Sequence, residues 1–192
     1  MVRATCPVLH VIISWRDSRQ APKKPYYDWH VPELQRLRGD HAPMVLAFEL
    51  ANRSYFATTI SDRGDEYFHT FAELHYAQVA EQESGACLYF VLVDEDGTIL
   101  GRFNLYEIHD GTANVGYRVA ENVAGRGVGT ATLRELCRIA ATTYGLQSLS
   151  AAVAVENIAS QRVLAKNGFV PDGPAELAGH AGTWYRRTLS EN

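Results

Sequence analysis

The spacing of hydrophobic residues changes several times along the chain, and each change predicts a different element. Short alternating or continuous apolar segments predict strands near residues 34–37, 88–93, 99–108, 114–119, 149–155, 169–170 and 184–189. Apolar residues at three- and four-residue spacing predict helices over residues 41–51, 65–83, 128–144 and 157–167. Asp40 is placed to cap the first of these helices, and Asp62 or Asp65 to cap the second. The run Arg53–Phe56 between them is predicted to be a loop.

The turns between the strands indicate how the strands pair. Asp94–Gly97 and Asp110-Gly111 each join two predicted strands over a few residues, as in β-hairpins. The order is therefore an antiparallel meander followed by alternating helices and strands, rather than a repeated βαβ series. The fold class predicted is α+β, an α/β sandwich built on a mixed, mostly antiparallel sheet.

The first thirty residues differ from the rest of the chain. The apolar run from Val8 to Ile13 is too short to cross a bilayer and is interrupted by His10. Pro22 and Pro25 follow it in a polar stretch. We expect residues 1–30 to be a loosely ordered extension without a signal peptide, and residues 31–192 to form one domain.

Charge and cysteine content exclude several function classes. The formal net charge is −4 with no basic stripe, which gives no reason to expect a nucleic-acid or membrane partner. Three widely separated cysteines, Cys6, Cys87 and Cys137, are typical of a cytoplasmic protein with reduced thiols. No Cys-x-x-Cys pair occurs, and His69 and His75 are six residues apart, so we expect no metal site.

The most informative stretch is a glycine-rich turn between a predicted strand and a predicted helix. Gly125, Gly127 and Gly129 let the backbone approach a ligand, and the first N–H groups of the helix have no partner within the helix. Such donors, at the positive end of the helix dipole, bind phosphate or diphosphate. The dinucleotide and nucleotide-triphosphate patterns both fail on spacing. The alternative is a tight turn with no ligand.

This turn resembles the coenzyme A motif of the GNAT superfamily of N-acetyltransferases, Gln/Arg-x-x-Gly-x-Gly/Ala. Here it reads Ala124-Gly125-Arg126-Gly127-Val128-Gly129, with Ala124 in place of the usual Gln or Arg. A second segment, Asn157 to Phe169, resembles the other coenzyme A segment of the family, in its RimJ/RimL-like branch of ribosomal-protein N-terminal acetyltransferases. Taken without the resemblance, that segment is a surface helix capped by Asn157 and ended by Gly168.

The resemblance implies a GNAT fold, with a sheet splayed near its middle, helices on both faces and acetyl-CoA in the gap. It implies that backbone groups of Tyr117 to Val119 hold the pantetheine, that Ala124 to Gly129 hold the diphosphate, and that Ser160 lies near the sulfur. The expected cofactor-binding residues are Tyr117, Arg118, Val119, Ala124, Gly125, Arg126, Gly127, Val128, Gly129, Thr130, Asn157 and Ser160.

Acetyl transfer needs a neutral amine and a proton for the departing thiolate. A chain-terminal amine, with a pKa of about 7.7 to 8.0, is largely neutral near neutral pH, whereas lysine at about 10.4 needs a base. Glu107, on the strand beside the cofactor strand, is our first candidate for a general base, and Glu49 is the second. Ser160 is the candidate proton donor. The alternatives are that Glu107 is simply solvated and that the Ser160 hydroxyl caps or packs.

The sequence thus predicts an acetyl-CoA-dependent N-acetyltransferase that acts by direct transfer in a ternary complex, as a monomer or homodimer. No cysteine lies in a recognisable nucleophile setting, which favours direct transfer. The acceptor is a protein N-terminus or a small-molecule amine such as an antibiotic or polyamine. Two other classes stay open: an acyl-CoA sensor without turnover, and a nucleotide-binding domain of another fold. The aromatics of Arg53–Phe56 either line the substrate opening or anchor their loop.

Overall fold

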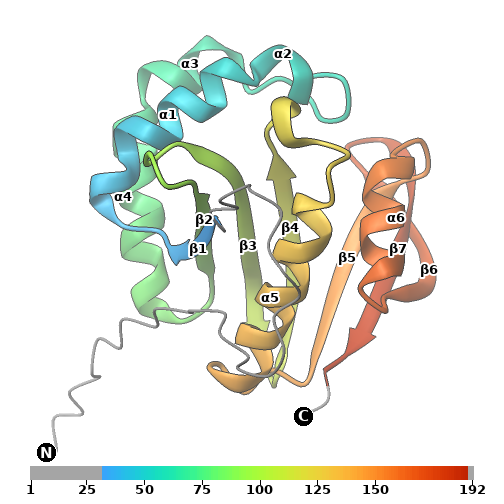
Figure 1. Cartoon of the computed structure of the whole chain (residues 1–192). Coiled ribbons are helices and arrows are strands. Elements are labelled where there is room, and N and C mark those ends of the chain that lie inside the picture. The colour runs from blue at the N-terminus through green and yellow to red at the C-terminus, as the bar shows by residue number, and fades with distance from the viewer. Residues whose placement is uncertain (1–31, 190–192) are drawn as a thin grey trace, which may run out of the picture.

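The computed structural model describes residues 32–189, which form one seven-stranded sheet with helices on both faces (Figure 1). The strands are β1 (Glu33–Arg36), β2 (Leu88–Val93), β3 (Ile99–His109), β4 (Thr112–Val119), β5 (Ser148–Ala154), β6 (Val170–Leu177) and β7 (His180–Thr188). The helices are α1 (Ala42–Ala51), α2 (Arg53–Phe56), α3 (Gly64–His69), α4 (Phe71–Glu81), α5 (Val128–Thr142) and α6 (Ile158–Lys166). Short 3-10 turns are η1 (Gly39–His41), η2 (Gln82–Ser84) and η3 (Glu121–Val123). The predicted extension, residues 1–30 with Cys6, lies outside the described residues.

The sheet is split near its middle, between β4 and β5. The strand order is β1-β2-β3-β4-β5-β7-β6, and every neighbouring pair is antiparallel except β4 with β5. These two strands pair only from Thr112 to Asn114 on β4, opposite Ser148 to Ser150 on β5. Beyond that point they diverge, as Figure 1 shows. The mixed, mostly antiparallel and splayed sheet is confirmed.

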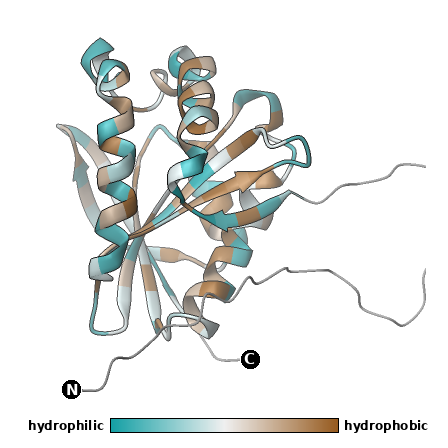
Figure 2. Ribbon diagram, turned by 90° about the vertical axis from the view of Figure 1, so that its left-hand side faces the viewer, coloured by the Kyte–Doolittle hydropathy of each residue, from teal (hydrophilic) through white to brown (hydrophobic). Residues whose placement is uncertain are grey.

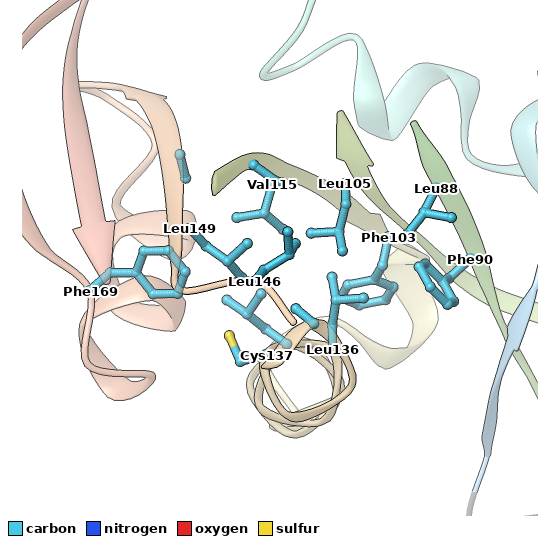
Figure 3. Close-up of a cluster of buried hydrophobic side chains, with 14 of the residues drawn as sticks. Leu88, Phe90, Phe103, Leu105, Val115, Leu136, Cys137, Leu146, Leu149 and Phe169 are labelled. Carbon is cyan, nitrogen blue, oxygen red and sulfur yellow. The ribbon is translucent and has the colours of Figure 1, made fainter. Parts of the chain in front are cut away.

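Two hydrophobic clusters hold the helices against opposite faces of the sheet. On one face, α5 inserts Leu133, Leu136, Cys137 and Ala140, the stripe predicted from the sequence. Figure 3 shows Leu136 and Cys137 pointing from this helix toward the strands. On the other face, Val45 and Phe48 of α1 pack with Phe71 of α4. Figure 2 shows apolar and polar residues alternating along these helices and strands. The strand β2 is buried on both faces, because its successive side chains enter the two clusters in turn.

The predicted helix over residues 65–83 is two helices instead of one. The break falls at Thr70, whose hydroxyl donates a hydrogen bond to the Glu66 carbonyl at 2.9 Å. A threonine hydroxyl that bonds to the preceding turn competes with the helical backbone and bends it. As a result α3 and α4 run in different directions (Figure 1).

The predicted caps of the first two helices were wrong for Asp40 and Asp65. All three aspartates pair with arginines, and of the three only Asp62 also accepts a backbone N–H at a helix start, that of Gly64 in α3. Asp40 pairs with Arg38, whereas Asp62 and Asp65 both pair with Arg53. The segment from Arg53 to Phe56, predicted as a loop, is the short helix α2. Charge-assisted bonds to a guanidinium are stronger than neutral caps, so the arginines decide where these carboxylates point.

Candidate active site

A cavity of about 450 Å³ opens where β4 and β5 diverge. Its walls come from the end of β4, the glycine turn before α5, one side of α6, and α2 with the loop after it. The lining residues are Tyr55, Phe56, Thr59, Ile60, Tyr117, Arg118, Val119, Val123, Ala124, Gly125, Gly127, Gly129, Thr130, Asn157, Ala159, Ser160, Arg162, Val163 and Lys166. The two segments singled out in the sequence therefore meet at one cavity.

The glycine turn presents bare backbone to this cavity. Gly125 and Gly127 have φ angles of +74° and +87°, a left-handed conformation that favours glycine, and a Cβ at either position would point into open space. Gly127 is the N-cap of α5, which is 15 residues long. In the described part of the chain, the N–H groups of Val128, Gly129 and Thr130 donate to no backbone or side-chain acceptor. The turn has the form of an anion cradle.

Three of the predicted cofactor residues differ from expectation in detail. The N–H group of Ala124 donates to the Glu121 carbonyl at 3.1 Å, within η3, so the free donors begin after this residue. The side chains of Arg126 and Val128 do not line the cavity. Only the backbone of Val128 is placed to serve the cradle.

The opposite wall carries two cations that the sequence analysis missed. Arg162 and Lys166 lie four residues apart on α6, so they project from the same side of the helix, and both line the cavity. The signal was present in the sequence as an i, i+4 pair of basic residues in the second motif. The family resemblance points to Asn157 and Ser160 in this segment and to neither basic residue.

Tyr117 and Ser160 are joined across the cavity. The Tyr117 hydroxyl lies 2.9 Å from Ser160 Oγ, where either oxygen can donate, and 3.3 Å from the Ser160 carbonyl oxygen, an alternative acceptor for its proton. Its ring stacks on Phe103 with centroids 5.6 Å apart. Burial raises the pKa of Tyr117 to about 12, so the phenol keeps its proton at neutral pH. Asn157 caps α6 by accepting the Ser160 N–H at 3.0 Å. The predicted cap is confirmed, and it fixes the position of Ser160.

Glu49, the second candidate for a general base, is held by two arginines. One of its oxygens accepts from Arg102 Nη1 at 2.7 Å and the other from Arg118 Nη1 at 2.9 Å. The side chains of Glu49 and Arg102 are 3% and 4% exposed, and that of Arg118 is 20% exposed. Both oxygens of this carboxylate are occupied by guanidiniums, and Glu49 does not line the cavity. This geometry argues against Glu49 as the general base.

Glu107 lies outside the cavity. It sits in the bulge where the pairing of β3 with β4 shifts register, with a φ of +54°, and its exposed side chain accepts a hydrogen bond from Asn114 Nδ2. The bulge turns this side chain toward Asn114, on the part of β4 that is still paired with β5. The position gives no geometric support to its predicted role as base.

The described residues that line the cavity include no aspartate, glutamate or histidine. Nor does any group of three metal-ligating side chains occur within residues 32–189. His75 is buried and its Nε2 lies 2.8 Å from the Arg38 carbonyl, while His69 is exposed. The ionisable groups among these lining residues are thus cations and two tyrosines, Tyr55 and Tyr117. Tyr55 and Phe56 of α2 both line the cavity and pack on the core. They therefore anchor their segment, as one alternative predicted, and they also face the cavity.

Comparison with known proteins places the fold and the family. The chain resembles the ribosomal-protein-S5-alanine acetyltransferase from Vibrio fischeri, with a TM-score of 0.78 and 19% identity over 86% of this chain and 97% of that one. For Mycobacterium smegmatis RimJ in complex with CoA-disulfide, the TM-score is 0.73 and the identity 23%, over 81% of this chain and 80% of that one. For spermidine N-acetyltransferase from Vibrio cholerae, in complex with CoA and spermine, the TM-score is 0.69 and the identity 18%, over 82% of this chain and 95% of that one.

These structural likenesses establish the GNAT-like fold. No curated protein sequence matches the chain. None of the helices within residues 32–189 is long and apolar enough to cross a bilayer. The sequence profile of the acetyltransferase (GNAT) domain matches residues 28–170, which is most of the chain. The chain therefore belongs to the GNAT family of acetyl-CoA-dependent acyltransferases.

Proposed function

We propose that this protein transfers the acetyl group of acetyl-CoA to a chain-terminal or other weakly basic primary amine, directly and in a ternary complex. The observation that carries the proposal is the combination of a bare glycine cradle with a cavity to which residues 32–189 contribute no carboxylate or histidine.

The cavity residues fit coenzyme A at both of its ends. Free N–H groups from Val128 to Thr130 suit the diphosphate, and Arg162 and Lys166 add positive charge on the facing wall. The gap beside β4 suits the pantetheine arm, because an unpaired strand edge offers alternating donors and acceptors. Acetyl-CoA supplies the thioester that is transferred.

Main-chain geometry at the end of β4 supports a donor for the thioester carbonyl oxygen. Ala120 N–H donates to the Leu100 carbonyl on β3 at 2.9 Å. Because N–H groups point to alternate sides along a strand, those of Tyr117 and Val119 face the gap. Val119 N–H is the donor that we assign to the carbonyl oxygen.

The proton for the departing thiolate is assigned to the Ser160 hydroxyl, and the serine oxygen takes up the proton that the attacking amine loses as the amide forms. The Tyr117 phenol, protonated at neutral pH, can donate to Ser160 Oγ and leave the serine hydrogen directed into the cavity. Among the described lining residues, no carboxylate or histidine can take a proton from the amine before it attacks. The amine must therefore enter in its neutral form, which favours a peptide terminus, with a pKa of about 7.7 to 8.0, over lysine.

The test combines calorimetric titration of coenzyme A with thiol release from acetyl-CoA and a short peptide. We expect binding, turnover, and a kcat/KM that rises with pH only as the peptide amine loses its proton. A second ionisation below pH 7 in that profile would reveal a base on the enzyme. Binding without thiol release from any amine would make the protein a sensor, and absence of binding would overturn the proposal.

A further inference from the structure

Arg118 reaches from the main cavity into a smaller pocket beside it. The two spaces share Phe56, Ile60 and Arg118 in their walls. The smaller pocket is closed by Glu49, Arg53, Ala57, Ser61, Asp62, Arg63 and Phe68. The smaller pocket has a volume of only about 20 Å³, so an acceptor whose amine lies in the main cavity can place one small group beside Arg118 at its mouth.

Positive charge exceeds negative charge around this smaller pocket. Asp62 and Asp65 are both occupied by Arg53, at 2.6 and 2.7 Å. Glu49 is shared between Arg102 and Arg118. Three carboxylates thus serve three guanidiniums, and Arg63 is a fourth guanidinium with no carboxylate partner among residues 32–189.

The two arginines with spare donors are near each other. Arg118 uses Nη1 for Glu49, and its Nε and Nη2 donate to no other described residue. Arg63 lies over the Tyr67 ring, with Cζ 4.4 Å from the centroid, and Arg118 lies over Phe56 at 5.1 Å. Burial lowers the pKa of Arg118, and the charge of Arg63 acts in the same direction. Two planar guanidiniums with spare donors thus line one pocket, and a carboxylate is the group that such donors bind best.

We propose that the acceptor carries a carboxylate close to its reactive amine, and that Arg118 and Arg63 bind this carboxylate. This proposal rests on the proposed function and narrows its acceptor. Two sources supply the chemistry: an acidic side chain in the first residues of a peptide, or the free carboxylate of an amino acid. A polyamine is disfavoured, because its cationic chain would meet the unneutralised guanidiniums.

The experiment compares acceptors that differ only in a carboxylate. One pair is a tripeptide amide beginning with glutamate and its counterpart beginning with glutamine, and the second pair is leucine and leucinamide. Spermidine is a fifth acceptor. For each acceptor, thiol release gives kcat/KM, and calorimetry with the enzyme–CoA complex gives binding without turnover.

We expect the acid of at least one pair to exceed its amide about tenfold or more, as expected for a charge-assisted bond, with spermidine the poorest acceptor. The pair that shows the preference identifies the source of the carboxylate. Arg118→Met and Arg63→Gln should each lower the acid-to-amide ratio toward one. Differences in amine basicity cancel when each variant is compared with wild type on the same two acceptors. For the acid-to-amide ratio of wild type, each kcat/KM is divided by the neutral fraction of its amine at the assay pH.

Arg63→Gln provides a test that does not depend on the fold, because this side chain is exposed. Arg134→Gln, on the exposed side of α5, removes the same charge far from both pockets and should leave the ratio unchanged. Equal use of acids and amides, a ratio unaffected by Arg63→Gln, or CoA binding with no response to any of the five acceptors would overturn the carboxylate site. Failure of coenzyme A to bind would instead overturn the proposed function, and this inference with it.

Discussion

The two ends of the cavity are built in opposite ways. At the glycine turn, the groups that face the ligand are main-chain N–H donors with almost no side chain beside them. At the other end, Arg118 is held in a buried cluster with Glu49 and Arg102. One end has unused donors, and the other has charges that are mostly paired with one another.

This difference indicates how selectively each end can bind a ligand. A cradle of backbone donors binds any suitably placed diphosphate, and it depends on a conformation that local sequence encodes. The ion cluster depends on charges that stay paired when buried, since an unpaired buried charge is costly. The cradle thus suits a common cosubstrate, whereas the charged end can distinguish acceptors.

The largest effect is expected from placing a charge in the cradle. In Gly127→Asp, a carboxylate stands where the diphosphate approaches, and at about 4 Å and an effective dielectric of about 20 the repulsion is about 4 kcal/mol, or roughly a thousandfold in affinity. Calorimetric titration of coenzyme A measures it. Gly145→Asp is the matched control, because Gly145 also has a positive φ, of +65°, and open space around a Cβ. Equal affinity in the Gly127 variant and wild type would remove the cradle from the site.

The next effect concerns the charged end and is one of stability. Glu49→Gln leaves Arg102 and Arg118 without a carboxylate in a buried setting, so we expect a loss of about 3 to 5 kcal/mol in the free energy of unfolding. Urea denaturation at pH 7 measures this loss as a lower midpoint.

Asp65→Asn is the control for that measurement. It makes the same chemical change at an ion pair with Arg53, but the Asp65 side chain is 79% exposed, so the loss should stay within about 1 kcal/mol. If the two variants lost similar stability, the cluster would be no different from a surface ion pair, and the contrast between the two ends would fail.

The same contrast explains how much the sequence could reveal. The cradle lies within six consecutive residues, and Asn157 caps its helix three residues before Ser160, so local spacing was sufficient to predict both. The alternation of apolar residues likewise predicted strands, and apolar residues at three- and four-residue spacing predicted the helix that buries its stripe as α5.

The charged end could not be predicted in this way. Glu49 is 53 residues from Arg102 and 69 from Arg118, and nothing in their local sequence marks them as partners. Sequence alternation places Arg102 and Arg118 on the same face only once the register of β3 with β4 is known. The bulge at Glu107 is likewise a feature of strand pairing that local sequence does not mark. On a regular strand Glu107 is a reasonable candidate for the general base, but the bulge changes the direction of its side chain.

The smallest effect on activity is expected from Glu107→Gln. An unchanged activity would support the contrast between the two ends of the cavity, neither of which then relies on this carboxylate. If neither end of the cavity holds a base, Glu107→Gln should leave kcat and the pH profile within about twofold of wild type, because removing an exposed charge away from the site is close to neutral. The amide keeps an acceptor for the Asn114 Nδ2 bond, so the bulge is preserved. Glu176→Gln, at an exposed position on β6, is the matched control. A tenfold fall in kcat with loss of an acidic ionisation, seen only at Glu107, would show that a base outside the cavity acts through water, and the acceptor amine would then not need to enter neutral.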